Sequence, residues 1–117
     1  MTIAEVSEKY DITQDTLRYY ERIGLIPRVN RNKSGMRDFN EDDLRWVEFI
    51  KCMRSAGLPI ETLMEYVKLY QQGDETIDAR INILMEQRRQ LVKRMEDMKE
   101  TLERLDIKIA GYERRII

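Results

Sequence analysis

The sequence predicts a mainly α-helical fold, with a winged helix-turn-helix domain in residues 1–73 and a long coiled-coil helix in residues 74–117. Three observations predict this arrangement. Two short amphipathic helices are joined by a tight turn, a polar turn between two short segments follows them, and an apolar repeat of about 3.5 residues runs towards the C-terminus. The length of 117 residues suits one compact domain with an extension.

The first two helices are delimited by their capping residues. Thr2 and Glu5 have the spacing of a capping box, and the apolar residues that follow at intervals of three and four predict a helix to Tyr10. Thr13 is expected to cap the second helix. Gly24 ends that helix, since glycine adopts the left-handed conformation of a C-cap at little cost.

The second helix has an apolar face and a polar face. Leu17 and Tyr20 are three residues apart and are expected to face the core. The outward residues are Gln14, Arg18, Tyr19 and Arg22. Guanidinium groups bind phosphates or the edge of guanine, and a tyrosine hydroxyl binds phosphate. This face is therefore predicted to contact DNA.

Residues 26–39 are predicted to form a β-hairpin around the turn signal Asn32-Lys33-Ser34-Gly35. Its strands are too short to be stable alone, so the hairpin must pack on the helices. Residues 18–37 hold six basic side chains and one acidic one, although the net charge of the whole chain is only −1. This local positive charge favours a wing that reaches a phosphate backbone; a solvated surface hairpin is the alternative.

Two further helices complete the predicted domain. Asn40 is expected to cap a third helix, whose wide apolar arc predicts that it is largely buried, and Gly57 is expected to close it. Pro59 opens a fourth helix. Gly73 then separates that helix from the C-terminal segment.

The C-terminal segment carries an apolar residue at alternating intervals of four and three. The repeating positions are Ile77, Ile81, Leu84, Leu91, Met95, Met98, Leu102, Leu105, Ile109, Tyr112 and Ile116, with Arg88 at the position between Leu84 and Leu91. Such a repeat is typical of a coiled coil. A narrow stripe on so long a helix needs a partner, most simply a second copy, so a homodimer is predicted. The repeat leaves parallel and antiparallel pairing open.

Composition excludes several other classes of protein. The one cysteine, Cys52, rules out an intrachain disulfide framework, and no apolar run approaches the roughly 20 residues of a membrane span. The N-terminus lacks a signal-peptide pattern, so a cytoplasmic protein is expected. The absence of histidine disfavours an enzyme, and no catalytic residue, metal site or cofactor is predicted.

Four segments resemble the MerR family of bacterial transcription regulators, and the resemblance extends over essentially the whole chain. The segments are "TLRYYERIGLIPR", "GMRDF", "EDDLRWVEFI" and "RSAGLPIETL". The resemblance implies a homodimer with antiparallel long helices, bound to a promoter whose spacer is unusually long. It also implies that the activated dimer bends and untwists the DNA, so that RNA polymerase meets both promoter elements.

The resemblance assigns contacts to individual residues. It implies that Arg18 and Tyr19 lie at the major groove and its phosphates, that Lys33 and Arg37 lie in a first wing, and that Arg54 lies in a second wing. Arg54 also has a second interpretation, as a cation at the negative end of its helix dipole.

The signal to which the protein responds is indicated only by resemblance. In this family, multidrug sensors carry a ligand-binding domain after the long helix and metal sensors carry cysteines there; residues 74–117 contain neither. The segment "IKCMRSAGLPIETL" resembles the subgroup that answers reactive aldehydes, quinones or nitrosative stress through one cysteine. It implies that Cys52 is a sensor thiol. Because this helix is expected to be buried, an adduct on Cys52 is expected to overpack it, at a cost of about 1–3 kcal/mol.

Three alternatives stay open at this stage. In the first, Cys52 is a small apolar core residue and not a sensor. In the second, the same fold is regulated by a small ligand that binds non-covalently. In the third, the chain is a coiled-coil protein-interaction module. The sequence shows no activating group for the thiol, because Cys52 lies mid-helix and Lys51 points about 100° away around the helix.

Overall fold

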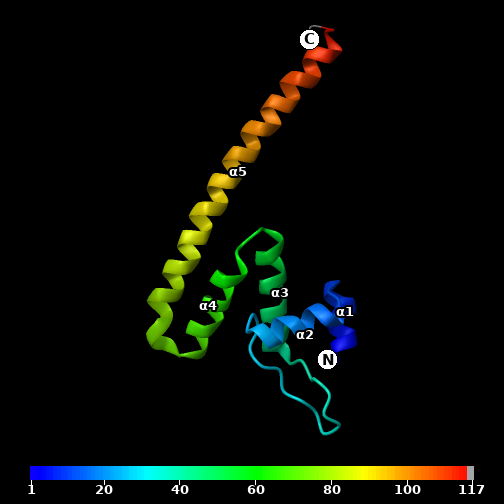
Figure 1. The fold of residues 1–117 in the computed structure, drawn as a ribbon, viewed down its shortest axis with the longest axis vertical. Helices are drawn as coiled ribbons and strands as arrows, with labels where there is room; N and C mark the ends of the chain where they lie inside the picture. The colour runs from blue at the N-terminus through cyan, green and yellow to red at the C-terminus, as the bar shows by residue number, and fades with distance from the viewer. Residues whose placement is uncertain (116–117) are drawn as a thin grey trace. The chain divides into compact units, whose positions relative to one another are not determined.

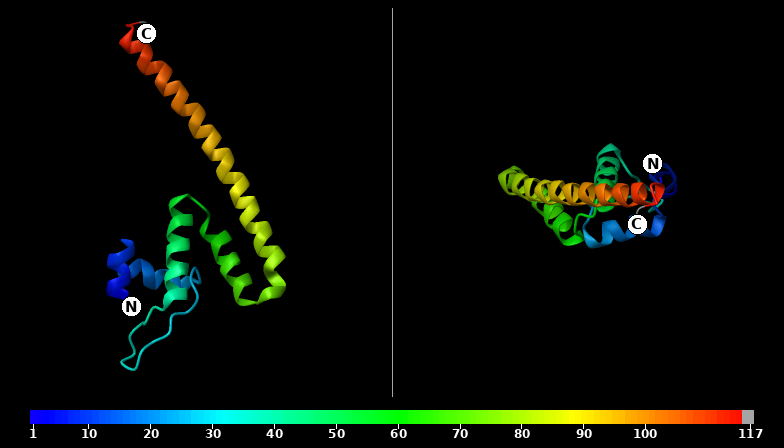
Figure 2. Two further views of the ribbon diagram at one scale, coloured as in Figure 1. Left: turned by 180° about the vertical axis from the view of Figure 1, so that it is seen from behind. Right: turned by 90° about the horizontal axis from the view of Figure 1, so that it is seen from above.

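The computed structural model describes residues 1–115, and contacts within the chain divide it into Met1–Ile83 and a second unit that begins at Leu84 (Figures 1 and 2). The elements in chain order are α1 (Ile3–Tyr10), α2 (Gln14–Ile23), α3 (Glu41–Ser55), α4 (Ile60–Gln71), the 3-10 turn η1 (Asp74–Thr76) and α5 (Ile77–Glu113). The mainly helical fold class is confirmed. The division of function between residues 1–73 and 74–117 stays a proposal.

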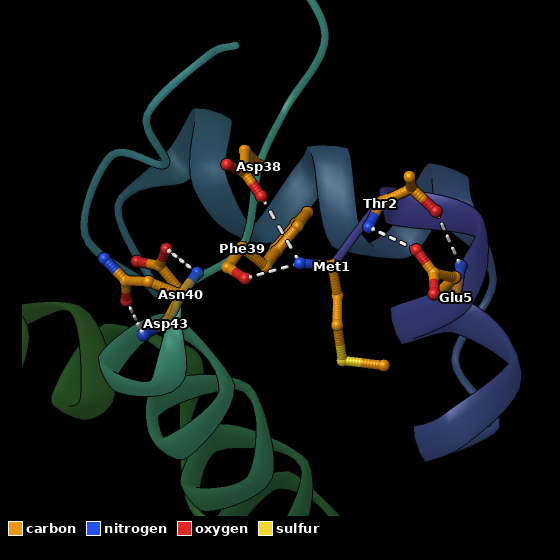
Figure 3. A network of polar contacts seen from close by, with 7 residues as sticks. All are labelled: Met1, Thr2, Glu5, Asp38, Phe39, Asn40 and Asp43. Carbon is orange, nitrogen blue, oxygen red and sulfur yellow. Dashed lines mark hydrogen bonds and ion pairs between the residues drawn. The ribbon is translucent and has the colours of Figure 1, made fainter.

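The predicted caps form as expected. The Thr2 hydroxyl accepts from the Glu5 amide while the Glu5 carboxylate accepts from the Thr2 amide, and Asn40 and Asp43 exchange the same two bonds at the start of α3 (Figure 3). Thr13 caps α2 by accepting from the amide of the third helical residue. Each cap satisfies backbone donors that a helix N-terminus leaves free.

The starts of α1 and α3 are tied together by main-chain hydrogen bonds. The Phe39 amide donates to the Met1 carbonyl at 2.8 Å, and the Met1 amino group donates to the Phe39 carbonyl at 2.8 Å (Figure 3). The same amino group lies 3.3 Å from an oxygen of Asp38. The segment that leaves the wing is thereby fixed to α1, so α2 and the wing are held at both ends.

One hydrophobic core holds the first unit together. Its buried side chains come from helices α1 to α4 and the loops between them: Val6, Ile12, Leu17, Leu25, Ile26, Val29, Phe39, Val47, Ile50, Leu58 and Leu63. The predicted inward face of α2 is confirmed, because Leu17 is buried and Tyr20 packs half-buried against this core. Gly24 ends α2 with φ 82°, which lets the chain turn back and bury Leu25.

The prediction that α3 is largely buried is wrong for the protomer. Only Asp43, Val47 and Ile50 are buried on this helix. The opposite side is a continuous exposed row of Glu41, Arg45, Glu48, Cys52 and Ser55. A wide apolar arc predicted burial, but α2 and α4 cover only one side of it. We call this set of five residues the exposed row of α3.

The predicted β-hairpin is present only as a hairpin-shaped loop between α2 and α3 (Figure 1). Residues 1–115 contain no strand, and a single antiparallel bridge joins Arg31 to Arg37. The turn itself is well formed, since the Asn32 side chain accepts from two amides within it and Gly35 has φ 79°. The arms on either side are too short to extend the ladder. The name "wing" is kept for residues 28–38.

The corner between α4 and α5 is fixed by polar contacts. Gly73 breaks the chain as predicted, with φ 102°. The Thr76 hydroxyl lies within hydrogen-bond distance of the Leu69 and Gly73 carbonyls, and Arg80 donates to that hydroxyl and to the Gly73 carbonyl. The Arg80 guanidinium also lies 5.4 Å from the centre of the Tyr70 ring. A 3-10 turn therefore precedes α5, where a continuous helix from Asp74 had been predicted.

Helix α5 is continuous over 37 residues, which corresponds to about 55 Å. Leu84 and Leu91 are half-exposed, and Arg88 is exposed. The other described seam residues are exposed: Ile77, Ile81, Met95, Met98, Leu102, Leu105, Ile109 and Tyr112. Ile116, the last predicted seam position, lies outside the described residues. Across residues 1–115, no helix is long and apolar enough to cross a bilayer.

Candidate nucleic-acid interface

Arg18 stands on the outer face of α2 and is held by residues of its own helix. Its guanidinium donates to the Asp15 carboxylate at 3.0 Å and to the Gln14 side-chain oxygen at 3.2 Å. The Asp15 side chain is almost fully exposed. A pair so exposed is weak, and a DNA phosphate or base edge can replace the carboxylate. These contacts orient the Arg18 side chain, and its guanidinium can still exchange them for contacts with DNA.

Tyr19 and Arg22 extend the same outer face. Both side chains are exposed, and the Arg22 guanidinium lies 5.5 Å from the centre of the Tyr19 ring. Such a cation–π contact at an exposed site is worth about 0.5–1 kcal/mol. It orients a guanidinium and a phenol together towards solvent. Tyr20 differs, because burial raises the pKa of Tyr20 and nearby Arg54 offsets part of that rise.

Glu21 connects α2 to both arms of the wing. One carboxylate oxygen accepts from the Arg37 Nε at 2.7 Å, and the other accepts from the Val29 amide at 2.7 Å. The side chains of Glu21 and Arg37 are only 12% and 19% exposed. Burial alone would raise the pKa of Glu21, but the hydrogen bonds from Arg37 and Val29 outweigh it, and the net pKa is lowered. Glu21 is therefore ionised at neutral pH.

Two arginines of the wing line a small cavity. A cavity of about 190 Å³ lies between α1, α2 and the wing. It is lined by Ile3, Arg18, Arg31, Gly35, Met36 and Arg37. Arg31 donates to the Gly35 carbonyl at 2.9 Å, which holds it against the turn. The lining therefore includes three arginine residues and no acidic residue.

The remaining predicted contacts lie away from this cavity. Lys33 is exposed at the tip of the wing. Arg54 is half-buried near the end of α3, and its guanidinium donates to the Leu58 carbonyl at 2.7 Å. That bond ties the last turn of α3 to the loop before α4. The DNA contacts of Lys33 and Arg54 stay proposals.

Sequence reasoning missed two residues of this region, Glu21 and Arg31. Glu21 is the one acidic side chain between residues 18 and 37, and an isolated carboxylate among six cations is a signal that it pairs with one of them. Which of the six cations Glu21 pairs with depends on the path of the wing and cannot be predicted from the spacing. For Arg31, the sequence indicated nothing beyond its positive charge.

Cys52 lies on the exposed row of α3. The interpretation of Cys52 as a core residue of the protomer is therefore wrong: it is two positions beyond buried Ile50, about 200° around the helix. The expectation that an adduct on Cys52 overpacks a buried helix is therefore also wrong, because Cys52 is exposed. The adjacent cation is engaged elsewhere, because the Lys51 ammonium donates to the Tyr10 carbonyl. Glu48, four residues before Cys52, places a carboxylate on the same row.

Profiles of known protein families match most of the chain. A profile described as MerR HTH family regulatory protein matches residues 1–69, and one described as MerR, DNA binding, matches residues 44–107. The chain belongs to the MerR family of transcriptional regulators. It is accordingly a DNA-binding regulator and not an enzyme.

Individual MerR-family proteins resemble the chain over most of its length. The HTH-type transcriptional regulator AdhR of Bacillus subtilis is 55% identical over 93 residues, which cover 80% of this chain and 66% of AdhR. A crystal structure from Listeria monocytogenes, assigned to the MerR family of transcriptional regulators, has a TM-score of 0.94 at 50% identity and covers 97% of this chain and 86% of that one.

A third relative was solved with DNA. HiNmlR, a MerR family regulator lacking the sensor domain, was crystallised bound to promoter DNA. Its structure has a TM-score of 0.89 at 30% identity and covers 97% of this chain and 90% of that one. Similarity at this level extends through both the helix-turn-helix region and α5.

Replacing Glu21 by Gln is expected to destabilise the first unit at neutral pH by about 1–3 kcal/mol, because two charge-assisted hydrogen bonds are weakened. The folded-state pKa of Glu21 is lowered, so its contribution is fully present above the unfolded value of about 4.3 and is lost as the pH falls through the folded value. Urea unfolding of wild type and variant at a series of pH values should show the difference shrinking in acid. A difference that does not change with pH would contradict the ion pair.

Asp43 also contributes to the pH dependence of stability that this experiment measures. Burial raises the pKa of Asp43, its backbone hydrogen bond to Asn40 opposes the rise, and nearby carboxylates, Glu21 included, add to it. A raised pKa favours the folded state as the pH falls, which is the opposite trend to Glu21. Asp43 is present in both proteins, so most of its effect cancels in the difference.

Proposed function

We propose that this MerR-family chain binds promoter DNA through the outer face of α2 and the wing. The observation that carries the proposal is that Arg18, Arg31 and Arg37 line one cavity between α2 and the wing, and that Tyr19 and Arg22 are exposed on the outer face of α2. Solvent-facing arginine and tyrosine side chains on a helix suit contact with phosphates and base edges. The structure of HiNmlR bound to promoter DNA supports promoter binding by this chain.

We further propose a homodimer formed by antiparallel pairing of α5. Most of the described seam residues of α5 are exposed, and Met98 reaches 71% exposure. A stripe of exposed methionine, leucine and isoleucine at coiled-coil spacing is stabilised when a second copy covers it. A dimer also brings two recognition helices to the two halves of a pseudo-palindromic operator.

As the mode of regulation we propose activation by DNA distortion. The dimer holds the promoter spacer in a bent and untwisted form, so that RNA polymerase meets both promoter elements. Deforming DNA over an operator costs several kcal/mol, so a modest change in the protein shifts the population of the distorted state. The proposed site of action is the cytoplasm, where the promoter lies.

For the signal we propose reaction of an electrophile with Cys52. The exposed position of the thiol supports this proposal, because a reagent can reach it. With an α,β-unsaturated aldehyde, the Cys52 thiolate forms a bond from sulfur to the β-carbon. The π electron pair moves to the carbonyl as an enolate, and a proton from water completes the saturated adduct. The reaction consumes no oxidant or reductant.

A non-covalent ligand is the second candidate signal, and an aromatic cavity favours it. A cavity of about 170 Å³ between α3 and α4 is lined by Arg45, Trp46, Phe49 and Tyr66. Trp46 lies edge-on to Phe49 and also contacts Tyr66 and Tyr70. A planar apolar molecule is the class of ligand that such rings accept. Trp46 is the one tryptophan, so its fluorescence reports binding directly.

Replacing Arg18 by Ala is expected to weaken operator binding by about 1–3 kcal/mol without unfolding the protein. Within residues 1–115, the hydrogen bonds of the Arg18 side chain go to Asp15 and Gln14 of its own helix, and Arg18 is not among the buried core residues, so its removal leaves the core intact. Tyr19→Phe should weaken binding less, because it removes only a hydroxyl. Fluorescence anisotropy with operator and scrambled duplexes measures both effects.

The two duplexes separate the possible roles of Arg18. If Arg18 reads a base, the loss is larger on the operator than on the scrambled duplex. If it binds only phosphate, both affinities fall equally. Lys9→Ala is the matched control, because Lys9 is an exposed cation on α1 outside the proposed interface. Unchanged operator affinity for Arg18→Ala would refute the proposed placement of α2 on DNA.

A further inference from the structure

Arg88 is the one charged residue at a seam position of α5, and its neighbours on the same helix are apolar. The residues three and four positions away are Leu84, Met85, Leu91 and Val92. Arg88 itself is exposed in the protomer. A cation in an apolar seam lowers the stability of a coiled coil unless an acidic group neutralises it. No acidic residue lies three or four positions from Arg88, so its own helix does not supply that group.

Asp106 is the complementary case, a carboxylate without a cation at the same spacing. The residues three and four positions away are Leu102, Glu103, Ile109 and Ala110. Ion pairs within the described part of α5 join other residues: Glu86 with Arg89, Lys93 with Asp97, and Glu100 with Arg104. Asp106 directly follows the seam residue Leu105, so it borders the seam. About 27 Å separates Arg88 from Asp106 along α5, so the two can meet only between two chains.

The orientation of two α5 helices decides what Arg88 meets. In a parallel, in-register pair each seam residue meets its own copy, so Arg88 would meet the partner's Arg88, and two like charges would repel each other. In an antiparallel pair, one alignment alone matches every seam position from Ile81 to Tyr112 with another position of that range. It matches Ile81 of one chain with Tyr112 of its partner and, in the same way, Leu84 with Ile109, Arg88 with Leu105, Leu91 with Leu102, and Met95 with Met98. The partner's Asp106 then borders the position of Arg88.

Antiparallel alignments shifted by one heptad are less favourable. In one direction Arg88 lies beside the partner's Lys99, which is a repulsive contact. In the other direction Arg88 lies beside the partner's Glu113, but Ile81 and Leu84 lose their matching positions within this range. The alignment that brings Arg88 to the partner's Asp106 therefore combines an attractive contact with the longest matched seam.

We propose that Arg88 fixes the antiparallel orientation and the register of the α5 dimer through an ion pair with the partner's Asp106, which the two-fold symmetry of the dimer forms twice. The inference rests on the proposed homodimer and adds to it the residues that select one alignment. The aliphatic part of the Arg88 side chain covers apolar neighbours such as Val92, while its guanidinium reaches the carboxylate at the edge of the seam. A polar residue at a single seam position specifies register at a cost in stability.

Charge reversal tests the ion pair. The dissociation constant of the dimer is measured by sedimentation equilibrium for wild type, Arg88→Asp, Asp106→Arg and the chain that carries both changes. Each single change creates two like-charge contacts per dimer and should weaken dimerisation at least tenfold, by less at high salt. The double change should restore dimerisation to within about threefold of wild type. Because the two positions are far apart within one chain, such a coupling can arise only between chains.

Glu103→Arg is the matched control. It makes the same charge change as Asp106→Arg at an exposed position of α5 outside the seam. It should leave the dissociation constant within about threefold of wild type. Combined with Arg88→Asp, it should not restore dimerisation, because Glu103 does not border the position that Arg88 occupies in the partner.

Disulfide formation tests the register without changing a charge. In Cys52→Ser chains, Leu91→Cys and Leu102→Cys are expressed separately and together and are then mildly oxidised. In the proposed register the two new cysteines face each other across the seam, whereas each lies about 16 Å along the axis from its own copy, too far for a disulfide. A disulfide should therefore form when the two chains are expressed together and in neither chain alone.

The outcomes separate this inference from the proposed homodimer. If the mixed disulfide forms but the double charge reversal restores nothing, the role of Arg88 is overturned and the antiparallel dimer stands. If the wild type is dimeric and the mixed disulfide does not form, the register is overturned. If Leu91→Cys crosslinks to its own copy, the helices are parallel, and the proposed antiparallel pairing fails together with the inference. A monomeric wild type removes the dimer itself.

Discussion

Replacing Leu91 and Leu102 by Asp is expected to convert the protein from a dimer to a monomer and to reduce operator affinity by about 10²–10⁴-fold. Both residues occupy the apolar seam of α5. A dimer of the variant would bury four unpaired carboxylates, and each buried charge without a partner costs several kcal/mol. The loss of affinity follows because the two recognition helices are no longer linked, and linkage contributes an effective concentration in the millimolar range.

Analytical ultracentrifugation and operator binding measure the two effects separately. The matched control is Asn82→Asp with Ile107→Asp, which adds the same charge to exposed positions of α5 outside the seam. The control should remain dimeric and bind normally. A wild-type protein that sediments as a monomer at micromolar concentration would contradict the dimer, whatever the variants do.

Local sequence signals predicted the helices and their ends well. The Thr2–Glu5 spacing, the cap at Thr13 and the left-handed Gly24 each depend on residues within four positions, and all three formed as expected. The inward position of Leu17 follows from the same local periodicity. Such features are predictable because the interacting groups are neighbours in the chain.

Features that depend on packing between distant segments were predicted less well. The apolar arc of α3 predicted burial on several sides, but only the side that meets α2 and α4 is covered, so Cys52 is exposed. The contact between Glu21 and Arg37 spans 16 residues around the wing. Neither the covered side of α3 nor the partner of Glu21 follows from periodicity, because both depend on contacts between segments that are distant in the sequence.

The exposure of Cys52 changes how an adduct can act. An adduct on the exposed row of α3 adds volume at the surface and leaves the core of the protomer unchanged. It shifts the equilibrium only if it interacts differently with the two states of the DNA-bound dimer. A difference of about 1.4 kcal/mol changes the ratio of the two states tenfold, which is enough for a transcriptional response.

Replacing Cys52 by Ser is therefore expected to abolish induction by an electrophile while folding, dimerisation and operator affinity stay within about threefold of wild type. Substitution at an exposed position away from the core rarely changes stability by more than about 0.5 kcal/mol, so the lost response would not reflect unfolding. Transcription in vitro from a promoter whose spacer contains an operator bound by the wild-type protein, with and without an α,β-unsaturated aldehyde, measures the response. Mass spectrometry of the wild type should find one adduct per protomer, on Cys52.

Moving the thiol along the same row gives the sharpest control. Cys52→Ser combined with Ser55→Cys places one thiol on the next exposed position of α3, about one turn away. This variant should form an adduct but should not activate, because the response depends on where the added group lies and not on alkylation alone. Normal induction of Cys52→Ser would exclude the thiol as the sensor. The signal would then be a non-covalent ligand, and quenching of Trp46 fluorescence by the inducer would identify the cavity lined by Trp46, Phe49 and Tyr66 as its site.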